Sequence, residues 1–181
     1  MDISKFKGAL GAGGARPNQF EVGIKWPTGV GAPSDSAKYL LVTGAALPAS
    51  TVNPAIIQYR GREVKLAGER IFDPWTITIA NDSDMSLRRP FEKWMDMMNT
   101  KGQQDSGNDA NMGEMQPSEY QRDLTVTHLD RNGDKLAGGG YTLWEAFPIN
   151  MSEIALQYAQ NDIIEEFTVT FQYQWYTVDE V

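Results

Sequence analysis

The sequence predicts a mainly β protein: a β-barrel or β-sandwich of two packed sheets with one flanking α-helix. Residues 19–26 and 167–175 alternate between apolar and polar side chains. Such alternation is typical of strands with one face on a core and the other in water. Only residues 86–99 carry the periodicity of an amphipathic helix. Many strands with a single mid-chain helix indicate this fold class.

The first half of the chain is expected to consist mostly of strands. Residues 1–18 are small, Gly-rich and lightly basic, and predict a flexible arm. Strands are predicted over residues 19–26 and 37–47, and an extended connection with Pro48 and Pro54 follows. Residues 62–82 are expected to form two strands that are joined near Ala67 and Gly68.

The helix predicted over residues 86–99 has one apolar stripe. Leu87, Phe91, Trp94 and Met98 recur at helical spacing, so we expect them to pack against a sheet. Pro90 restricts where the helix begins, because proline is tolerated only in the first turn.

Residues 101–118 are expected to form a long polar loop, and strands resume after it. Strands are predicted near residues 120–130, 141–147 and 152–158, before the closing strand. Asn132 and Gly133 predict a hairpin turn. The 181 residues favour a single domain.

No catalytic, cofactor-binding or metal-binding residues are predicted. Residues 130–141 resemble a calcium loop, but Lys135 and Tyr141 stand where Gly and Glu are required. His128 is the one histidine, and it lies within a strand pattern. Glu165 and Glu166 are adjacent on a predicted strand, so they should point to opposite faces. We therefore expect neither an enzyme nor a cofactor.

Charge and hydropathy exclude further classes. The net charge of −8 argues against nucleic-acid binding by phosphate attraction. The chain has no cysteine, and hence no disulfide framework. No stretch has the length of a transmembrane helix or a secretory signal, so no membrane anchor is expected.

Three strings carry a family resemblance: GGARPNQFEV, STVNPAIIQYRGREVKLAGERIFDPWTITIANDSDMSLRRPFEKWM and NDIIEEFTVTFQYQWY. They resemble the tail tube protein of contractile-tailed bacteriophages, over about residues 13–100 and 120–177. The loop 101–118 has no counterpart in the resemblance.

The resemblance implies a structural role in the virion tail, assembled in the host cytoplasm. Six subunits would form a homohexameric ring with a shared inner β-barrel, and rings would stack into a hollow tube. The implied partners are the sheath protein, the tape measure protein, and baseplate or tail terminator proteins. DNA would cross the tube without specific binding. The same fold serves secretion systems and phage-derived injection particles.

The resemblance makes two groups of residues candidates, one for lining the lumen and one for contact between rings. The polar face of the closing strand carries Thr168, Thr170, Gln172 and Gln174. This face either lines the lumen or lies on the outer surface in water, and the pattern favours neither. Extended segments around the proline pair are candidates for contact between rings, namely Pro48, Thr51, Asn53, Pro54, Tyr59 and Arg60.

Two other readings stay open at this stage. One is the tube of a non-replicating contractile machine, such as a tailocin or a secretion tube, which neighbouring genes would separate from a phage tail. The other is a monomeric carbohydrate-binding β-sandwich, which requires exposed coplanar aromatic rings and does not polymerise. A β-fold hydrolase is disfavoured by the lone His128 and the missing motifs.

Overall fold

The structure, a computed structural model, describes residues 2–10, 14–98, 116–159 and 161–179. In chain order the elements are α1 (Ile3–Ala9), β1 (Phe20–Ile24), the 3-10 helix η1 (Ser36–Leu41), β2 (Val42–Ala45), β3 (Ser50–Tyr59), β4 (Arg62–Phe72), β5 (Trp75–Ala80), α2 (Arg88–Met98), α3 (Pro117–Tyr120), β6 (Arg122–Leu129), β7 (Lys135–Met151), β8 (Glu166–Gln172) and β9 (Trp175–Val178).

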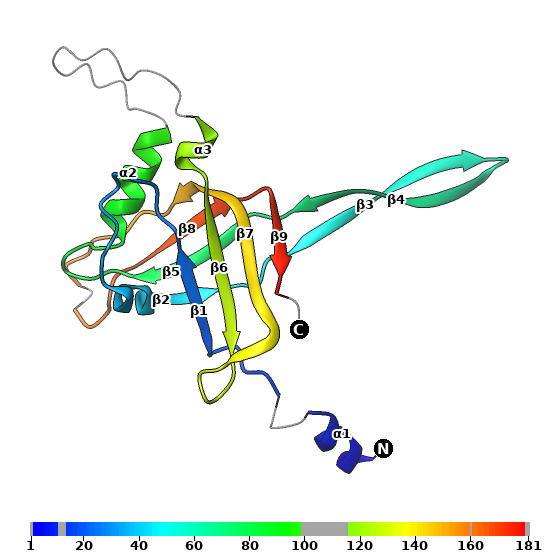
Figure 1. Cartoon of the computed structure of the whole chain (residues 1–181), viewed down its shortest axis with the longest axis horizontal. Coiled ribbons are helices and arrows are strands. Elements are labelled where there is room, and N and C mark those ends of the chain that lie inside the picture. Colours follow the sequence, from blue (N-terminus) through cyan, green and yellow to red (C-terminus); the bar gives the residue numbers. More distant parts are fainter. Residues whose placement is uncertain (1, 11–13, 99–115, 160, 180–181) are drawn as a thin grey trace.

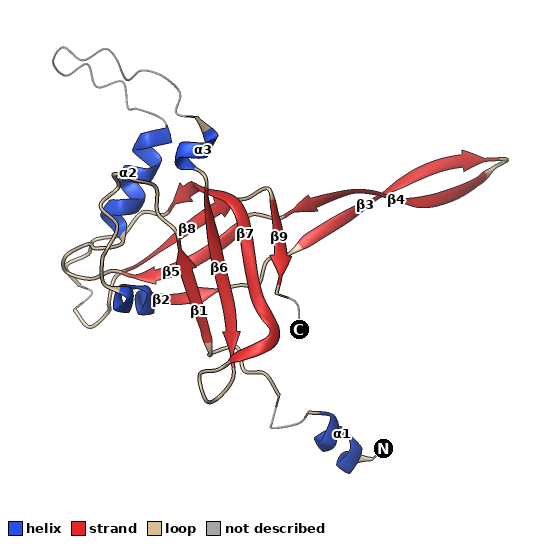
Figure 2. Cartoon of the chain, viewed as in Figure 1, coloured by secondary structure: helices blue, strands red, loops and turns tan. Residues whose placement is uncertain are grey.

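Seven strands build the body of the molecule, and β3 and β4 form a separate two-stranded hairpin. The order in the body is β1-β6-β7-β8-β5-β2, with β9 also paired to β7, and all neighbours are antiparallel. β7 is shared by two half-sheets: its first part pairs with β6 and β9, and its last residues pair with β8. Figure 2 shows the two half-sheets crossing at β7.

The division of β7 has a local cause at Glu145. This residue has φ 55, and the register with β6 shifts between Arg122 and Leu124, opposite Glu145. An extra residue of this kind is a β-bulge, which bends a strand and increases its twist. One strand thereby passes from one half-sheet to the other, and their apolar faces enclose a common core.

The core is built from alternate residues of the strands. On β8, Phe167, Val169 and Phe171 are buried, and on β5 the buried residues are Trp75, Ile77 and Ile79. Leu124, Val126 and Leu143 of the other half-sheet complete the centre of the core. The predicted mainly β fold of two packed sheets is confirmed.

Helix α2 flanks the sheets and inserts its aromatic residues into the core. Phe91 and Trp94 are fully buried, Leu87 just before the helix is buried, and Met98 packs partly buried against the core. The ring of Trp94 lies 5.7 Å from that of Trp26 and 6.2 Å from that of Phe171. These are distances at which aromatic pairs attract each other.

Asp82 fixes the turn that leads into α2. Its carboxylate accepts hydrogen bonds from the backbone amide and the hydroxyl of Ser86, both at 2.7 Å, and it pairs with Lys38 at 2.6 Å. The hydrogen bond from Lys38 and those from Ser86 lower the pKa of Asp82 to about 2, against the opposing effect of its partial burial. Asp82 is therefore ionised across the neutral range.

The β3–β4 hairpin projects from the body along the longest axis of the molecule (Figure 1). Arg60 and Gly61 have φ 49 and φ 79, and they join Tyr59 to its partner Arg62. Two successive residues at positive φ make the type I′ turn that suits the twist of a two-residue hairpin. The expected turn at Ala67 and Gly68 is wrong, because both lie within β4.

Gly68 has a different role from the one predicted. A Cβ atom on Gly68 would collide with the carbonyl oxygen of Asn53 on the facing strand. The register of the hairpin shifts here, between Val52 and Pro54. Glycine thus permits a close backbone approach at a bulge, which is a common reason for glycine inside a strand.

Other expectations also need correction. Residues 37–47 begin as the 3-10 helix η1 and only end as a strand, and residues 152–158 contain no strand. The residues expected to be a connection, 48–60, largely form β3. Within the segment predicted to be a flexible arm, Ile3–Ala9 form helix α1, and Asp2 accepts hydrogen bonds at its start. Most of the loop 101–118 lies outside the described residues, and Pro117–Tyr120 is helical.

Candidate assembly surfaces

The hairpin exposes a long run of residues that includes many large apolar side chains. Neither face packs on the body, and residues 51–71 are all exposed. The large apolar side chains exposed on it are Val52, Ile56, Ile57, Tyr59, Val64, Leu66 and Ile71. Residues 50–72 also carry four basic and two acidic side chains, whereas the whole chain has a net charge of −8. Exposed apolar strands of this length mark an interaction surface.

The residues predicted to contact another ring lie on or beside this hairpin. Thr51, Asn53, Pro54 and Tyr59 are exposed on β3, and Arg60 is exposed in the turn. Pro48 is half-buried in the connection before β3. The structure thus gathers the set onto one projecting element and its root.

An aromatic cluster holds the root of the hairpin against the body. The ring of Phe72, the last residue of β4, lies 5.9 Å from that of Tyr173 and 5.6 Å from that of Tyr176. The Tyr173 hydroxyl donates to the Ala49 carbonyl at 3.3 Å, and the Tyr176 and Ser50 hydroxyls lie 3.3 Å apart. Burial above all raises the pKa of Tyr173 to about 12, so its hydroxyl stays protonated as a donor.

The outward face of β5 and β8 is polar and uncharged along most of its length. Thr76 lies opposite Thr170 and Thr78 opposite Thr168, and the Thr76 and Thr170 hydroxyls are 2.9 Å apart. Gln172 continues this face toward the end of β8.

Gln174 does not belong to that face. The predicted closing strand is broken at Tyr173 and Gln174 into β8 and β9. The backbone amide of Gln174 donates to the Trp144 carbonyl at 3.1 Å. Beyond the break the alternation fails, since Trp175 is 42% exposed and its ring stacks on Trp144 at 6.5 Å.

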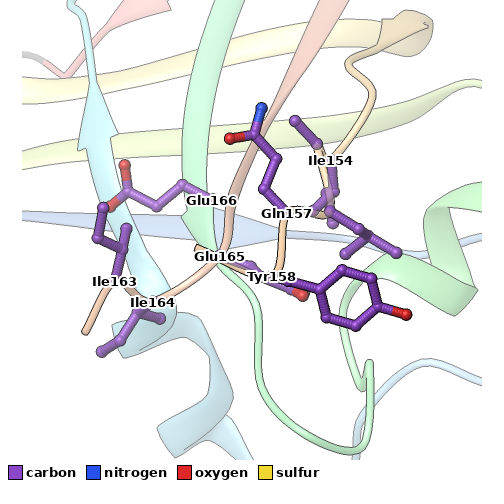
Figure 3. A pocket seen from close by; sticks show the side chains of 9 residues that line it. Ile154, Gln157, Tyr158, Ile163, Ile164, Glu165 and Glu166 are labelled. Carbon is purple, nitrogen blue, oxygen red and sulfur yellow. The ribbon is translucent and has the colours of Figure 1, made fainter. Parts of the chain in front are cut away.

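A groove of about 710 Å³ lies at the connection between β7 and β8 (Figure 3). The residues that line it, which we call the β7–β8 groove, are Ile154, Ala155, Leu156, Gln157, Tyr158, Ile163, Ile164, Glu165 and Glu166. Leu156 is 80% and Ile164 is 71% exposed. Glu165 and Glu166 both line this groove, but they are not neighbours on one strand as expected, because β8 begins at Glu166.

The described residues contain no group of three or more His, Asp or Glu side chains placed to hold a metal ion. Asp130 serves the predicted hairpin turn, accepting from the backbone amides of Asn132 at 2.7 Å and Asp134 at 3.0 Å. The Nε2 atom of His128 lies 2.7 Å from the carbonyl oxygen of Arg16. Among the described residues, no helix has the length and apolar character needed to cross a membrane.

Comparison with known proteins identifies the family. A family model described as phage tail tube protein matches residues 15–179. The chain belongs to the phage tail tube protein family. Tail tube protein gp19 of Enterobacteria phage T4 is 28% identical over 156 residues, which cover 86% of each protein.

Solved structures share the tail tube fold. A chain of the anti-feeding prophage baseplate superposes with a TM-score of 0.61 at 15% identity, covering 92% of this chain and 95% of that one. A chain of the sheath-tube complex of an extracellular contractile injection system gives a TM-score of 0.56 at 12% identity, covering 100% and 99%. The predicted resemblance to tail tube proteins is confirmed.

Sequence reasoning missed the hairpin as a unit and the β7–β8 groove. One signal for the hairpin was present: Arg60 and Gly61 stand between two segments that each contain valine and isoleucine. A dipeptide that ends in glycine between such segments is a hairpin signal. No sequence signal marks the groove, because its apolar residues alternate with other residues in the same way as those of a strand.

Proposed function

We propose that six copies of this tail tube protein close into a ring. The rings stack into a hollow tube that delivers phage DNA to the host, surrounded by a contractile sheath. The observation that carries the proposal is the match of the tail tube family model to residues 15–179. The chain contributes no catalysis and binds no cofactor in this role.

Two features of the fold support assembly. The body sheet ends at β1 and β2, whose outer edges are not paired with another strand of the described chain. Unpaired edges are a liability in a monomer, and they favour pairing with a neighbouring subunit in a ring. The hairpin extends well beyond the body and offers an apolar surface for a second contact, between rings (Figure 1).

Electron microscopy of the purified protein at high concentration tests the proposal. We expect six-fold rings or stacked tubes in negative stain. A monodisperse monomer at every concentration, with no rings after removal of salt or addition of crowding agents, would contradict it.

The proposal includes partners and a location. The sheath protein would surround the tube, the tape measure protein would occupy the lumen, and baseplate and tail terminator proteins would cover its two ends. The subunit would assemble in the host cytoplasm and remain in the virion tail. The sheath-tube complex of a contractile injection system shares the fold, which supports a sheath as neighbour. It also favours a second candidate, the tube of a non-replicating machine, which a gene cluster without capsid genes would indicate.

We propose further that the outward face of β5 and β8 lines the lumen. Thr168, Thr170 and Gln172 are candidates here, with Thr76 and Thr78 beside them, and Gln174 is the weakest because it lies beyond β8. Hydroxyl and amide groups are well hydrated and do not attract phosphate. Lys or Arg at these positions would instead hold DNA through counterion release.

Lysine at two of these positions should slow genome ejection without preventing tube assembly. Thr168→Lys with Gln172→Lys places added positive charges around each ring, and these attract phosphate within a Debye length of about 10 Å at ~0.1 M salt. Ejection of DNA from virions is measured at low and high salt, and added salt should partly restore the rate.

Thr168→Gln is the matched control, because both positions then hold a long uncharged side chain. Its ejection rate should equal that of the wild type. Wild-type ejection by the double-lysine variant at low salt would show that this face does not contact the DNA.

A further inference from the structure

The turn of the hairpin carries an aromatic and a cationic side chain together. Tyr59 is 60% exposed, and the Arg60 guanidinium lies over its ring at 5.3 Å. Tyr and Arg are enriched among the residues that carry most of the binding energy at protein interfaces. We call Tyr59 and Arg60 the hairpin tip.

The backbone conformation at the tip is energetically unfavourable for an arginine. Arg60 has φ 49, a left-handed conformation that Asn or Gly adopts more cheaply in this type of turn. A non-glycine residue held in such a conformation directs attention to function. The side chain of Arg60 is therefore worth testing for a role that the turn itself does not require.

The β7–β8 groove has the complementary character. Apolar side chains, among them Leu156, Ile163 and Ile164, form part of its walls, and two carboxylates, Glu165 and Glu166, also line it. Glu165 accepts from the Asn81 amide at 3.0 Å and Glu166 from the Thr43 hydroxyl at 3.3 Å. A carboxylate has about four acceptor positions, so both retain capacity for an arginine. Residues 152–166 contain four acidic side chains and no basic one.

The tip and the groove lie at opposite ends of the molecule. The view in Figure 1 places the longest axis horizontally, with the hairpin at one end and the β7–β8 connection, in orange, at the other. The tip of a chain therefore does not reach its own groove. A contact between opposite ends of two copies is heterologous, and such contacts continue from copy to copy.

We infer that the tip of one copy docks in the β7–β8 groove of another copy. The Tyr59 ring enters between the apolar walls, and the Arg60 guanidinium pairs with Glu165 and Glu166. This inference rests on the proposed tube, for which it names both sides of one contact between rings. Arginine suits the site because its planar group binds carboxylates in a bidentate manner.

Engineered disulfides test the contact directly, since the chain contains no cysteine. Tyr59→Cys and Leu156→Cys are introduced in two separate proteins, which are mixed, assembled and oxidised. We expect a covalent dimer that requires both proteins, because a disulfide needs Cα atoms closer than about 7 Å. Arg131→Cys, on an exposed turn away from the groove, replaces Leu156→Cys as the control and should give none.

Two further variants separate docking from folding. Arg60→Asn favours the same turn, so the hairpin should form at least as well, while the critical concentration for tubes rises about tenfold. Arg60→Glu and Glu165→Arg should each weaken assembly, and the two changes combined in one chain should restore it, because the pair is then reversed.

The outcomes separate this inference from the proposed function. If the wild type forms tubes but the Tyr59→Cys and Leu156→Cys proteins do not become linked, the docking is overturned and the proposed tube is not. Normal assembly of Arg60→Asn has the same meaning. A disulfide between Phe6→Cys of α1 and Leu156→Cys, instead of one to Tyr59→Cys, also overturns the docking, since α1 then occupies the groove. A wild-type protein that forms neither rings nor tubes overturns both.

Discussion

Replacement of Trp94 by alanine is expected to lower the free energy of unfolding by about 3–5 kcal/mol, the range measured for truncation of buried aromatic residues. Trp94 is completely buried between α2 and the sheets, and its indole donates to the Tyr120 carbonyl at 2.8 Å. The variant loses apolar burial and leaves both a cavity and an unpaired carbonyl. Chemical denaturation of the unassembled subunit, followed by circular dichroism, measures the loss.

Arg89→Ala is the control for this variant. Arg89 lies on the exposed side of the same helix, so its loss changes helix propensity little and removes no core packing. We expect a change within about 0.5 kcal/mol, as for most surface substitutions. If Trp94→Ala were equally mild, α2 would not be anchored in the core as the structure describes.

Shortening the hairpin is expected to prevent tube formation and to leave the subunit folded. The change removes residues 57–64 and joins Ile56 to Lys65, which are paired across the hairpin, through an Asn-Gly turn. The removed residues are exposed and contribute nothing to the core, so thermal stability should not fall. They include the apolar Ile57, Tyr59 and Val64, which we propose are covered in the tube.

Thermal melting and negative-stain microscopy of the shortened protein measure the two effects separately. A matched control keeps the full length and replaces only Gln58 by Thr, another uncharged side chain suited to a strand. Tubes of normal length from the shortened protein would show that the outer hairpin is dispensable, and a large drop in melting temperature would show that it stabilises the body.

The sequence predicted the elements whose side chains face the core. Phe167, Val169 and Phe171 alternate because every second residue of β8 is buried, and the spacing of Phe91 and Trp94 follows the buried side of α2. Burial imposes a period on the sequence, and this period is what pattern analysis detects. The fold class and the helix were predictable for that reason.

The candidate surfaces were predictable only in part, because exposure imposes no such period. Ile154, Leu156 and Tyr158 alternate like a strand, yet the last two are exposed and line the groove. Both faces of the hairpin strands are exposed to solvent in the subunit, so their apolar residues are not confined to one face and show no regular alternation. Trp175 continues the apolar–polar alternation of β8 in the sequence, but it lies beyond a break in the strand that only the tertiary structure reveals.

The sharing of β7 by both half-sheets has a mechanical consequence. Its 17 residues pair with β9 near the hairpin root and, past the bulge at Glu145, with β8. In a tube pushed through an envelope, compressive load would enter each subunit through the contacts between rings. Part of that load would then pass along a covalent backbone to β8, with little need for side chains to slide past one another. The subunit would thus act as a stiff strut, and its resistance to buckling would come from one continuous chain segment.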